Sequence, residues 1–140
     1  EIFIIDIDRD SEAYDKVFHC FRMPKATDEE KTVRSAAIQE ATKFAATVPM
    51  EVARNAYKLM DIIEKVARLG NQNAVTDACV AMMSARSAVL SALMNVRINL
   101  GSLKDKEFVA RFASEADELE RLACDKEKLL LDAVKQIIES

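Results

Sequence analysis

The sequence predicts an all-α protein, an up-and-down antiparallel bundle of four or five long helices. Only two glycines and two prolines occur in 140 residues. Because these residues supply most tight turns, a many-stranded sheet would lack its turn chemistry. Half of the residues are apolar and 31% are charged, which is typical of a globular protein. Apolar residues recur every three or four positions along most of the chain. We therefore expect one helical domain over residues 1–140, with short connections.

The first predicted helix covers residues 1–21. It ends before Pro24, because proline disfavours the helical conformation in the residue that precedes it. A run of β-branched residues at its start leaves a short strand as the alternative there. The apolar positions that predict the helix are Ile4, Ile7, Tyr14, Val17, Phe18 and Phe21.

A second helix is predicted to begin at Asp28. Thr27 and Glu30 form a capping box, in which each side chain accepts a hydrogen bond from a free backbone N–H of the other residue. Pro49 predicts a break or a kink, after which the helical spacing resumes. Gly70 is expected to end the helix, since glycine readily adopts the conformation that follows a helix end.

The third predicted helix, residues 74–100, carries very little charge. Its only charged residues are Asp77, Arg86 and Arg97, and at 1.5 Å per residue it would extend for about 40 Å. A helix of this composition is expected to be surrounded by neighbours. One of its faces is small and polar, and we expect the helix to pack through it. That face consists of Asp77, Ala81, Ser84, Ala88, Ser91 and Asn95.

Asp105 is predicted to cap a last long helix, which has one apolar side and one charged side.

The formal net charge of the chain is −4, with acidic and basic residues interleaved, so nucleic acid is not an expected partner. No uncharged apolar stretch reaches the roughly 20 residues of a membrane span, so we expect a soluble protein with no membrane partner. The three cysteines, Cys20, Cys79 and Cys124, are widely spaced and predict reduced thiols and a cytoplasmic location.

Few residues are candidates for catalysis or metal binding. His19 is the only histidine, and we interpret it as a packed side chain with a backbone partner. Asp6, Asp8 and Asp10 form an acidic cluster that could raise one pKa or bind a cation, but a solvated helix face is the preferred interpretation. We therefore expect neither a metal nor a cofactor.

The segment that leads into the third helix is rich in side-chain amides. It includes Asn71 and Asn73, and it ends at Asp77. A buried Asp77 would have to be hydrogen-bonded, cap the helix, or be retained for function, because burying a carboxylate without a partner costs several kcal/mol. Asn95 and Asn99 lie one turn apart at the other end. They are candidates either for bonds between helices or for hydrogen bonds to a planar ligand.

Several short motifs follow one another between residues 7 and 108. They are Asp8-Arg9-Asp10-Ser11-Glu12-Ala13-Tyr14, Met23-Pro24-Lys25, Glu29-Glu30-Lys31 with Arg34, Ala36-Ala37-Ile38-Gln39, Val48-Pro49, Gly70-Asn71-Gln72-Asn73-Ala74-Val75-Thr76-Asp77-Ala78 and Asn95-Val96-Arg97-Ile98-Asn99-Leu100. In this order they resemble the family of formiminotetrahydrofolate cyclodeaminases and methenyltetrahydrofolate cyclohydrolases, which are helical folate enzymes. Members of that family usually begin with a further helical region that carries a glycine-rich segment, and this sequence starts after the place of that segment.

The resemblance implies a folate enzyme that closes 5-formiminotetrahydrofolate to 5,10-methenyltetrahydrofolate with release of ammonia. Hydrolysis of the methenyl ring is the related alternative, and a non-catalytic helical interaction or scaffold protein is the alternative of another class. The resemblance also implies a homodimer or a higher homo-oligomer, no metal, and a tetrahydrofolate derivative as substrate. The site residues that it suggests are Asp77 for acid–base catalysis, Asn71, Asn73, Asn95 and Asn99 for hydrogen bonds to the ligand, and Lys25 or Arg34 for the carboxylates of its tail.

Overall fold

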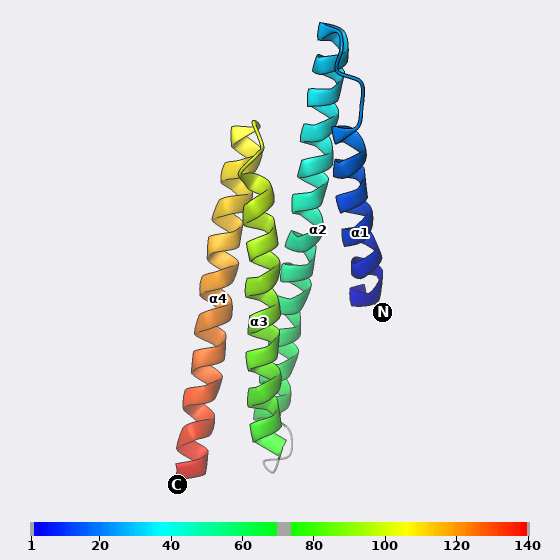
Figure 1. Ribbon diagram of the computed structural model, residues 1–140. Coiled ribbons are helices and arrows are strands. Elements are labelled where there is room, and N and C mark those ends of the chain that lie inside the picture. The colour runs from blue at the N-terminus through cyan, green and yellow to red at the C-terminus, as the bar shows by residue number, and fades with distance from the viewer. Residues whose placement is uncertain (1, 70–73, 140) are drawn as a thin grey trace.

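The computed structural model describes residues 2–69 and 74–139 as four long helices (Figure 1). The helices are α1 (Ile2–Phe21), α2 (Asp28–Leu69), α3 (Val75–Leu100) and α4 (Lys106–Glu139). The predicted all-α class is confirmed. The alternative of a strand at the start of the chain is wrong, because α1 begins at Ile2 and the described ranges contain helices and their connections alone.

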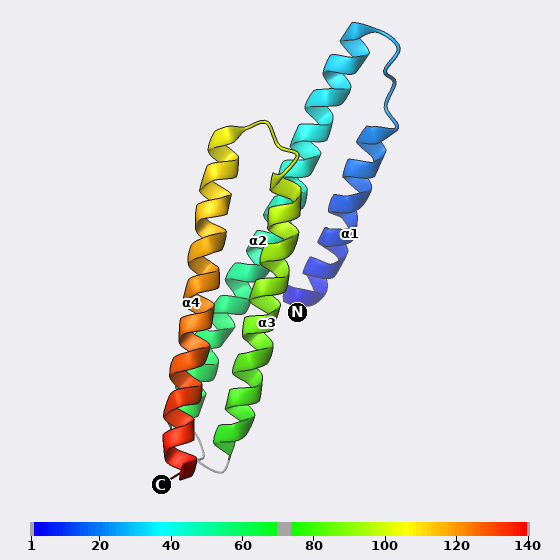
Figure 2. The same ribbon diagram turned by 60° about the vertical axis from the view of Figure 1, so that its left-hand side comes forward.

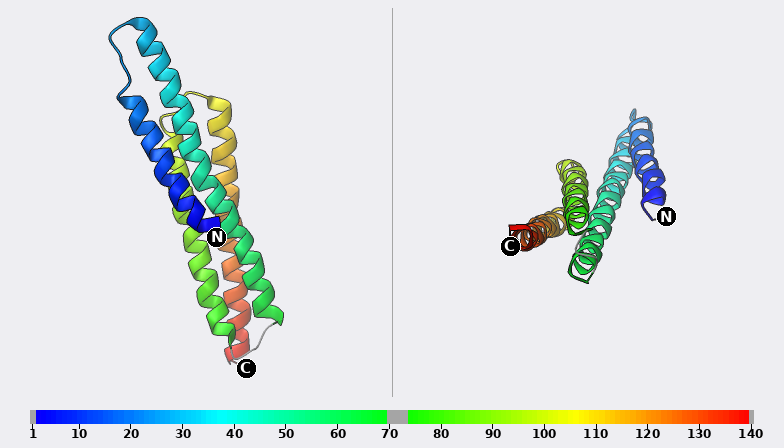
Figure 3. Two further views of the ribbon diagram at one scale, coloured as in Figure 1. Left: turned by 90° about the vertical axis from the view of Figure 1, so that its right-hand side faces the viewer. Right: turned by 90° about the horizontal axis from the view of Figure 1, so that it is seen from below.

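Consecutive helices run in opposite directions and lie side by side (Figure 2). Seen along the bundle, α3 lies between α4 and α2, and α1 covers the far side of α2 (Figure 3). Because α1 is 20 residues long and α2 is 42, α1 covers only the half of α2 that is nearer to their connection. The arrangement is the predicted up-and-down bundle.

The main core lies between α2, α3 and α4. Its fully buried side chains of largest volume include Met50 and Met60 of α2 and Met82 and Leu93 of α3. A smaller cluster joins α1 to α2 through Ala13, Ala45 and Val48. Small residues dominate that second contact, so α1 can approach α2 closely.

Local sequence signals fix the ends of two helices as predicted. Thr27 Oγ1 accepts from the backbone N–H of Glu30 at 3.2 Å, and Glu30 Oε2 accepts from the N–H of Thr27 at 3.2 Å. Asp105 Oδ1 accepts from the N–H of Phe108 at 3.0 Å at the start of α4. Of the break or kink predicted at Pro49, the break is wrong, since α2 passes through this residue without ending. The kink stays a prediction.

The packing of α3 differs from the sequence-based expectation. The helix is not surrounded, and its small polar face is exposed rather than packed. It contacts α2 and α4 through larger side chains on the opposite side, because these bury more apolar area than alanine or serine would. The buried residues of α3 are Val75, Cys79, Met82, Ala85, Val89, Ala92, Leu93, Val96 and Leu100.

Among the described helices, α3 is the one that is long and apolar enough to cross a membrane, with a mean hydropathy of 1.4 in its most apolar stretch. It contains no uncharged stretch of that length, because Asp77, Arg86 and Arg97 interrupt it. Length and composition are weak evidence for a span, since the central helix of a bundle also meets them.

Candidate functional site

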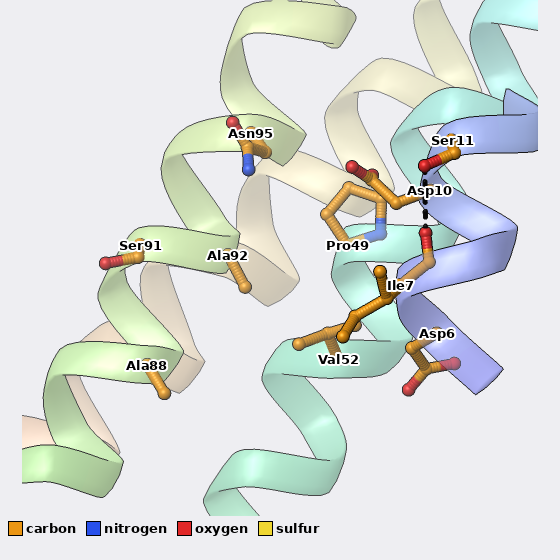
Figure 4. A pocket seen from close by; sticks show the side chains of 10 residues that line it. All are labelled: Asp6, Ile7, Asp10, Ser11, Pro49, Val52, Ala88, Ser91, Ala92 and Asn95. Carbon is orange, nitrogen blue, oxygen red and sulfur yellow. Dashed lines mark hydrogen bonds between the residues drawn. The ribbon is translucent and has the colours of Figure 1, made fainter. Parts of the chain in front are cut away.

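A cavity of about 460 Å³ lies between α1, α2 and α3, at the middle of the bundle (Figure 4). Its apolar lining comes from all three helices, whereas its polar side chains come from α1 and α3. The lining residues are Asp6, Ile7, Asp10, Ser11, Pro49, Val52, Ala88, Ser91, Ala92 and Asn95. An apolar cavity with a few convergent polar groups is the usual form of a site for a small organic ligand.

A carboxylate and a side-chain amide face each other across this cavity. The carboxylate of Asp10 extends from α1 toward α3, where Asn95 stands on the opposite wall (Figure 4). Both side chains are exposed to solvent. The hydroxyl of Ser11 is already engaged, because it donates to the carbonyl of Ile7 at 3.2 Å. Asp10 can therefore accept a proton or a hydrogen bond, and Asn95 can donate one.

A network of charged side chains fixes the beginning of α1 on α2. Asp6 is 5% exposed, and its Oδ1 accepts from Nη1 of Arg9 at 3.1 Å. The same Arg9 nitrogen forms an ion pair with Glu51 of α2 at 2.7 Å, and the hydrogen bond to Glu51 is the largest cause that raises the pKa of Arg9. Asp10 lies one turn after Asp6 on the same face of α1. The network thus helps to set the position of the Asp10 carboxylate.

Asn99 joins α3 to α2 beside the cavity. Its Nδ2 donates to the carbonyl of Ala45 at 3.1 Å and to the carbonyl of Asn95 at 2.9 Å. In a regular helix the carbonyl of Ala45 would accept from the backbone N–H of residue 49, and Pro49 has none. The side chain of Asn99 supplies the missing donor, and both of its N–H groups are engaged by protein.

The structure separates Asp77 from the cavity of the same chain. Asp77 is exposed in the first turn of α3. It precedes Asn95 by 18 positions, which is about 27 Å along the helix at 1.5 Å per residue. The predicted ligand-binding residues Asn71 and Asn73 lie outside the described residues.

The two predicted binders of a carboxylate tail are Lys25 and Arg34, in the connection between α1 and α2 and near the start of α2. This connection and the start of α3 lie at opposite ends of the molecule (Figure 1). Lys25 is exposed in the connection between α1 and α2. Arg34 donates from Nη2 to the carbonyl of Phe21 at 3.1 Å, and its guanidinium lies 5.7 Å from the centre of the Phe21 ring. Among the predicted site residues within the described ranges, Asn95 and Asn99 are the two that one chain brings together at the cavity.

Two residues of the acidic cluster of α1, which the sequence favours as a solvated helix face, belong to the cavity. Asp6 and Asp10 line the cavity, whereas Asp8 does not. Asp6 and Asp10 are four residues apart and therefore share one face of the helix, whereas Asp8 lies on another face. Within the described ranges, no group of three or more histidine, cysteine, aspartate or glutamate side chains could hold a metal ion.

Comparisons with known proteins agree on one family. The family model described as formiminotransferase-cyclodeaminase matches residues 1–118. The methenyltetrahydrofolate cyclohydrolase of Methylorubrum extorquens is 42% identical over 110 residues, which are 79% of this chain and 53% of that protein. The formimidoyltransferase-cyclodeaminase of Sus scrofa is 30% identical over 129 residues, which are 92% of this chain and 24% of that protein.

A solved structure gives the same result for the fold. The formiminotetrahydrofolate cyclodeaminase of Thermotoga maritima superposes with a TM-score of 0.77 at 28% sequence identity. The match covers 93% of this chain and 61% of the Thermotoga chain. The chain thus spans about half of the length of the cyclohydrolase and about a quarter of the Sus scrofa protein.

Proposed function

This chain belongs to the formiminotransferase-cyclodeaminase family, and on that basis we propose that it is a subunit of a folate-dependent one-carbon enzyme. The reaction that we propose first is the cyclisation of 5-formiminotetrahydrofolate to 5,10-methenyltetrahydrofolate with release of ammonia. The observation that carries the proposal is the cavity with Asp10 and Asn95 on opposite walls. Its volume is within the range of sites that bind small organic ligands, roughly 300–1,000 Å³.

The cyclisation needs proton transfer at two nitrogens. A bond forms between N10 and the formimino carbon, and N10 gives up its proton. The formimino nitrogen takes up that proton and one more from solvent, its bond to carbon breaks, and ammonia departs. We assign the proton transfer to Asp10, because an ionised carboxylate in reach of both nitrogens can accept the proton and return it. Asn95 donates a hydrogen bond that holds the substrate in the cavity.

Hydrolysis of 5,10-methenyltetrahydrofolate is the second candidate, and the 42% identity to the Methylorubrum cyclohydrolase favours it. Water adds to the methenyl carbon, the bond from that carbon to N5 breaks, and a 10-formyl group remains with release of one proton. Both reactions place 5,10-methenyltetrahydrofolate in the site, as product or as substrate. The same carboxylate can act in either direction, taking a proton from water in the hydrolysis.

Two assays on the purified protein distinguish these reactions. We expect ammonia release from 5-formiminotetrahydrofolate if the cyclodeaminase assignment is right, and loss of the methenyl absorbance without ammonia if the protein is a cyclohydrolase. Asp10→Asn should abolish either activity while leaving the helix content unchanged. If no folate derivative is converted or raises the melting temperature while the protein still self-associates, the scaffold interpretation replaces both proposals.

We also propose a homodimer or a higher homo-oligomer, in which Asp77 acts on the site of a neighbour. The small polar face of α3 is exposed, so a second copy can approach it closely. Its six positions are symmetrical about residue 86, since 77 pairs with 95, 81 with 91, and 84 with 88. Two α3 helices packed in antiparallel fashion about a two-fold axis would therefore bring Asp77 of the partner subunit toward Asn95. The charge of Arg86 does not oppose this packing, because Arg86 is paired with Glu127 of α4 at 2.7 Å.

Mixing two inactive variants tests this arrangement. If the site combines Asp10 of one subunit with Asp77 of the partner subunit, Asp10→Asn and Asp77→Asn mixed in equal amounts should regain activity. Half of the randomly formed dimers are mixed, and each has one intact site of two, so about a quarter of the original activity should return. An active Asp77→Asn variant would show that Asp77 is not needed for the reaction.

The three cysteines are free, which supports our further proposal of a reducing, cytoplasmic location.

A further inference from the structure

The side chain of Asn99 forms hydrogen bonds within the protein and has no role in the proposed reaction. The sequence predicts for this side chain either a bond between helices or a hydrogen bond to a ligand. Its N–H groups donate to the carbonyls of Ala45 and Asn95, and the first of these is a bond between helices. A donor that is engaged twice within the protein is not free for a substrate. Asn99 is half-buried and lies one turn after Asn95, at the end of the cavity.

The bond from Asn99 to Ala45 depends on the proline in α2. Because Pro49 has no N–H, the carbonyl of Ala45 is left without its helical partner. Ala45 is 9% exposed, and an unpartnered buried carbonyl is costly, so this carbonyl strongly favours an external donor. Pro49 itself lines the cavity. The proline thus shapes the wall and also creates the acceptor to which α3 is tied.

The same bond joins the two helices that carry opposite walls of the cavity. Pro49 stands on α2 and Asn95 on α3 (Figure 4). The bond between Asn99 and Ala45 links these helices within one turn of both residues. We propose that Asn99 is a positioning residue, which holds α3 on α2 so that Asn95 faces Asp10. This role rests on the proposed function, since it concerns the same site.

Binding of a stable folate tests the proposal without turnover. The probe is 5-formyltetrahydrofolate, which carries a one-carbon group on N5, titrated by calorimetry at a temperature where circular dichroism reports every variant as folded. Asn99→Ala and Asn99→Asp both remove the donor, and each should weaken binding by about tenfold, because the Ala45 carbonyl loses its partner and α3 is no longer tied to α2 at the cavity. Asn99→Asp keeps the size of the side chain, so a loss of binding there is not due to a hole.

Gln39 provides a matched control. Its amide donates from Nε2 to the carbonyl of Ser102 at 3.0 Å and accepts from the N–H of Lys104 at 2.7 Å. It therefore joins α2 to the connection that follows α3, and it does not line the cavity. Gln39→Ala should lower stability and leave the affinity for 5-formyltetrahydrofolate unchanged. Equal affinities in the Asn99 and Gln39 variants would show that Asn99 is merely structural and would overturn the proposal.

The positioning role of Asn99 can be tested even if the proposed function is wrong. If the unaltered protein binds no folate, NMR spectra of the backbone amides still report the position of α3. Asn99→Ala should shift the amide signals of Ala88 and Ser91, although Ala88 lies 11 positions and about 16 Å from the substitution. Gln39→Ala should leave these signals in place. Unshifted signals in Asn99→Ala would refute the positioning role, whatever the protein binds.

Discussion

Arg54 of α2 and Glu115 of α4 form a two-pronged ion pair. Nε of Arg54 lies 2.5 Å from Oε1 of Glu115, and Nη2 lies 2.7 Å from Oε2. This parallel geometry is the strongest form of an arginine–carboxylate contact. The helices that it joins are not consecutive in the sequence, and Lys126 of α4 makes a second link to α2 through Asp61. The Arg54–Glu115 pair thus helps to hold α4 against α2.

The Arg54–Glu115 pair predicts a pH dependence of stability. The hydrogen bond from Arg54 holds the pKa of Glu115 below its usual 4.5. A lowered folded-state pKa stabilises the fold above the unfolded pKa, and this stabilisation is lost as the pH falls through the folded value. Unfolding by urea should therefore show that Glu115→Gln costs about 0.5–1 kcal/mol at pH 7, given the partial exposure of both side chains. The cost should shrink at pH 3.

Glu118→Gln is the control for this experiment. Glu118 pairs with Arg121 at 2.8 Å within α4, and both side chains are more than half exposed. Its loss should not change the stability measurably at pH 7. An equal effect of the two substitutions would mean that the link between α2 and α4 adds nothing beyond an ordinary surface charge.

The capping box at the start of α2 predicts a local effect. Thr27→Ala removes the oxygen that accepts from the N–H of Glu30 and should destabilise the protein by about 1 kcal/mol. Thr32→Ala is the matched control, because the hydroxyl of Thr32 only donates to the carbonyl of Asp28 inside the helix. Thermal unfolding should show a lower melting temperature for Thr27→Ala, and an unchanged or slightly higher one for Thr32→Ala. The reverse order would contradict the capping role.

Helix caps could be predicted from the sequence, whereas features that depend on the packing of helices could not. The capping box of Thr27 and the cap of Asp105 act within one turn, so sequence spacing suffices to find them. The exposure of the small face of α3 depends on which neighbours reach it, and composition does not contain that information. The cavity depends on where α1 ends along α2. The sequence alone therefore could not show that Asp10, in the middle of α1, lines the cavity and that Asp77, in the first turn of α3, does not.

The three cysteines should differ in their reactivity. Burial raises the pKa of the Cys79 thiol, and the thiolate is the reactive form. Cys20 and Cys124 are only half-buried. A chromogenic disulfide reagent at pH 8 should thus modify two thiols rapidly and Cys79 slowly, with all three reacting at similar rates in denaturant. Rapid modification of three thiols in the folded protein would show that Cys79 is accessible.

The dependence of Asn99 on Pro49 can be measured as a coupling energy. In the unaltered protein, Asn99→Ala leaves the carbonyl of Ala45 without a donor and should cost about 1–3 kcal/mol. Pro49→Ala restores a backbone N–H at position 49, so the same substitution should cost less in that background. A double-mutant cycle by urea unfolding isolates the difference. Equal costs in both backgrounds would mean that the missing helical donor is not the reason for the bond between Asn99 and Ala45.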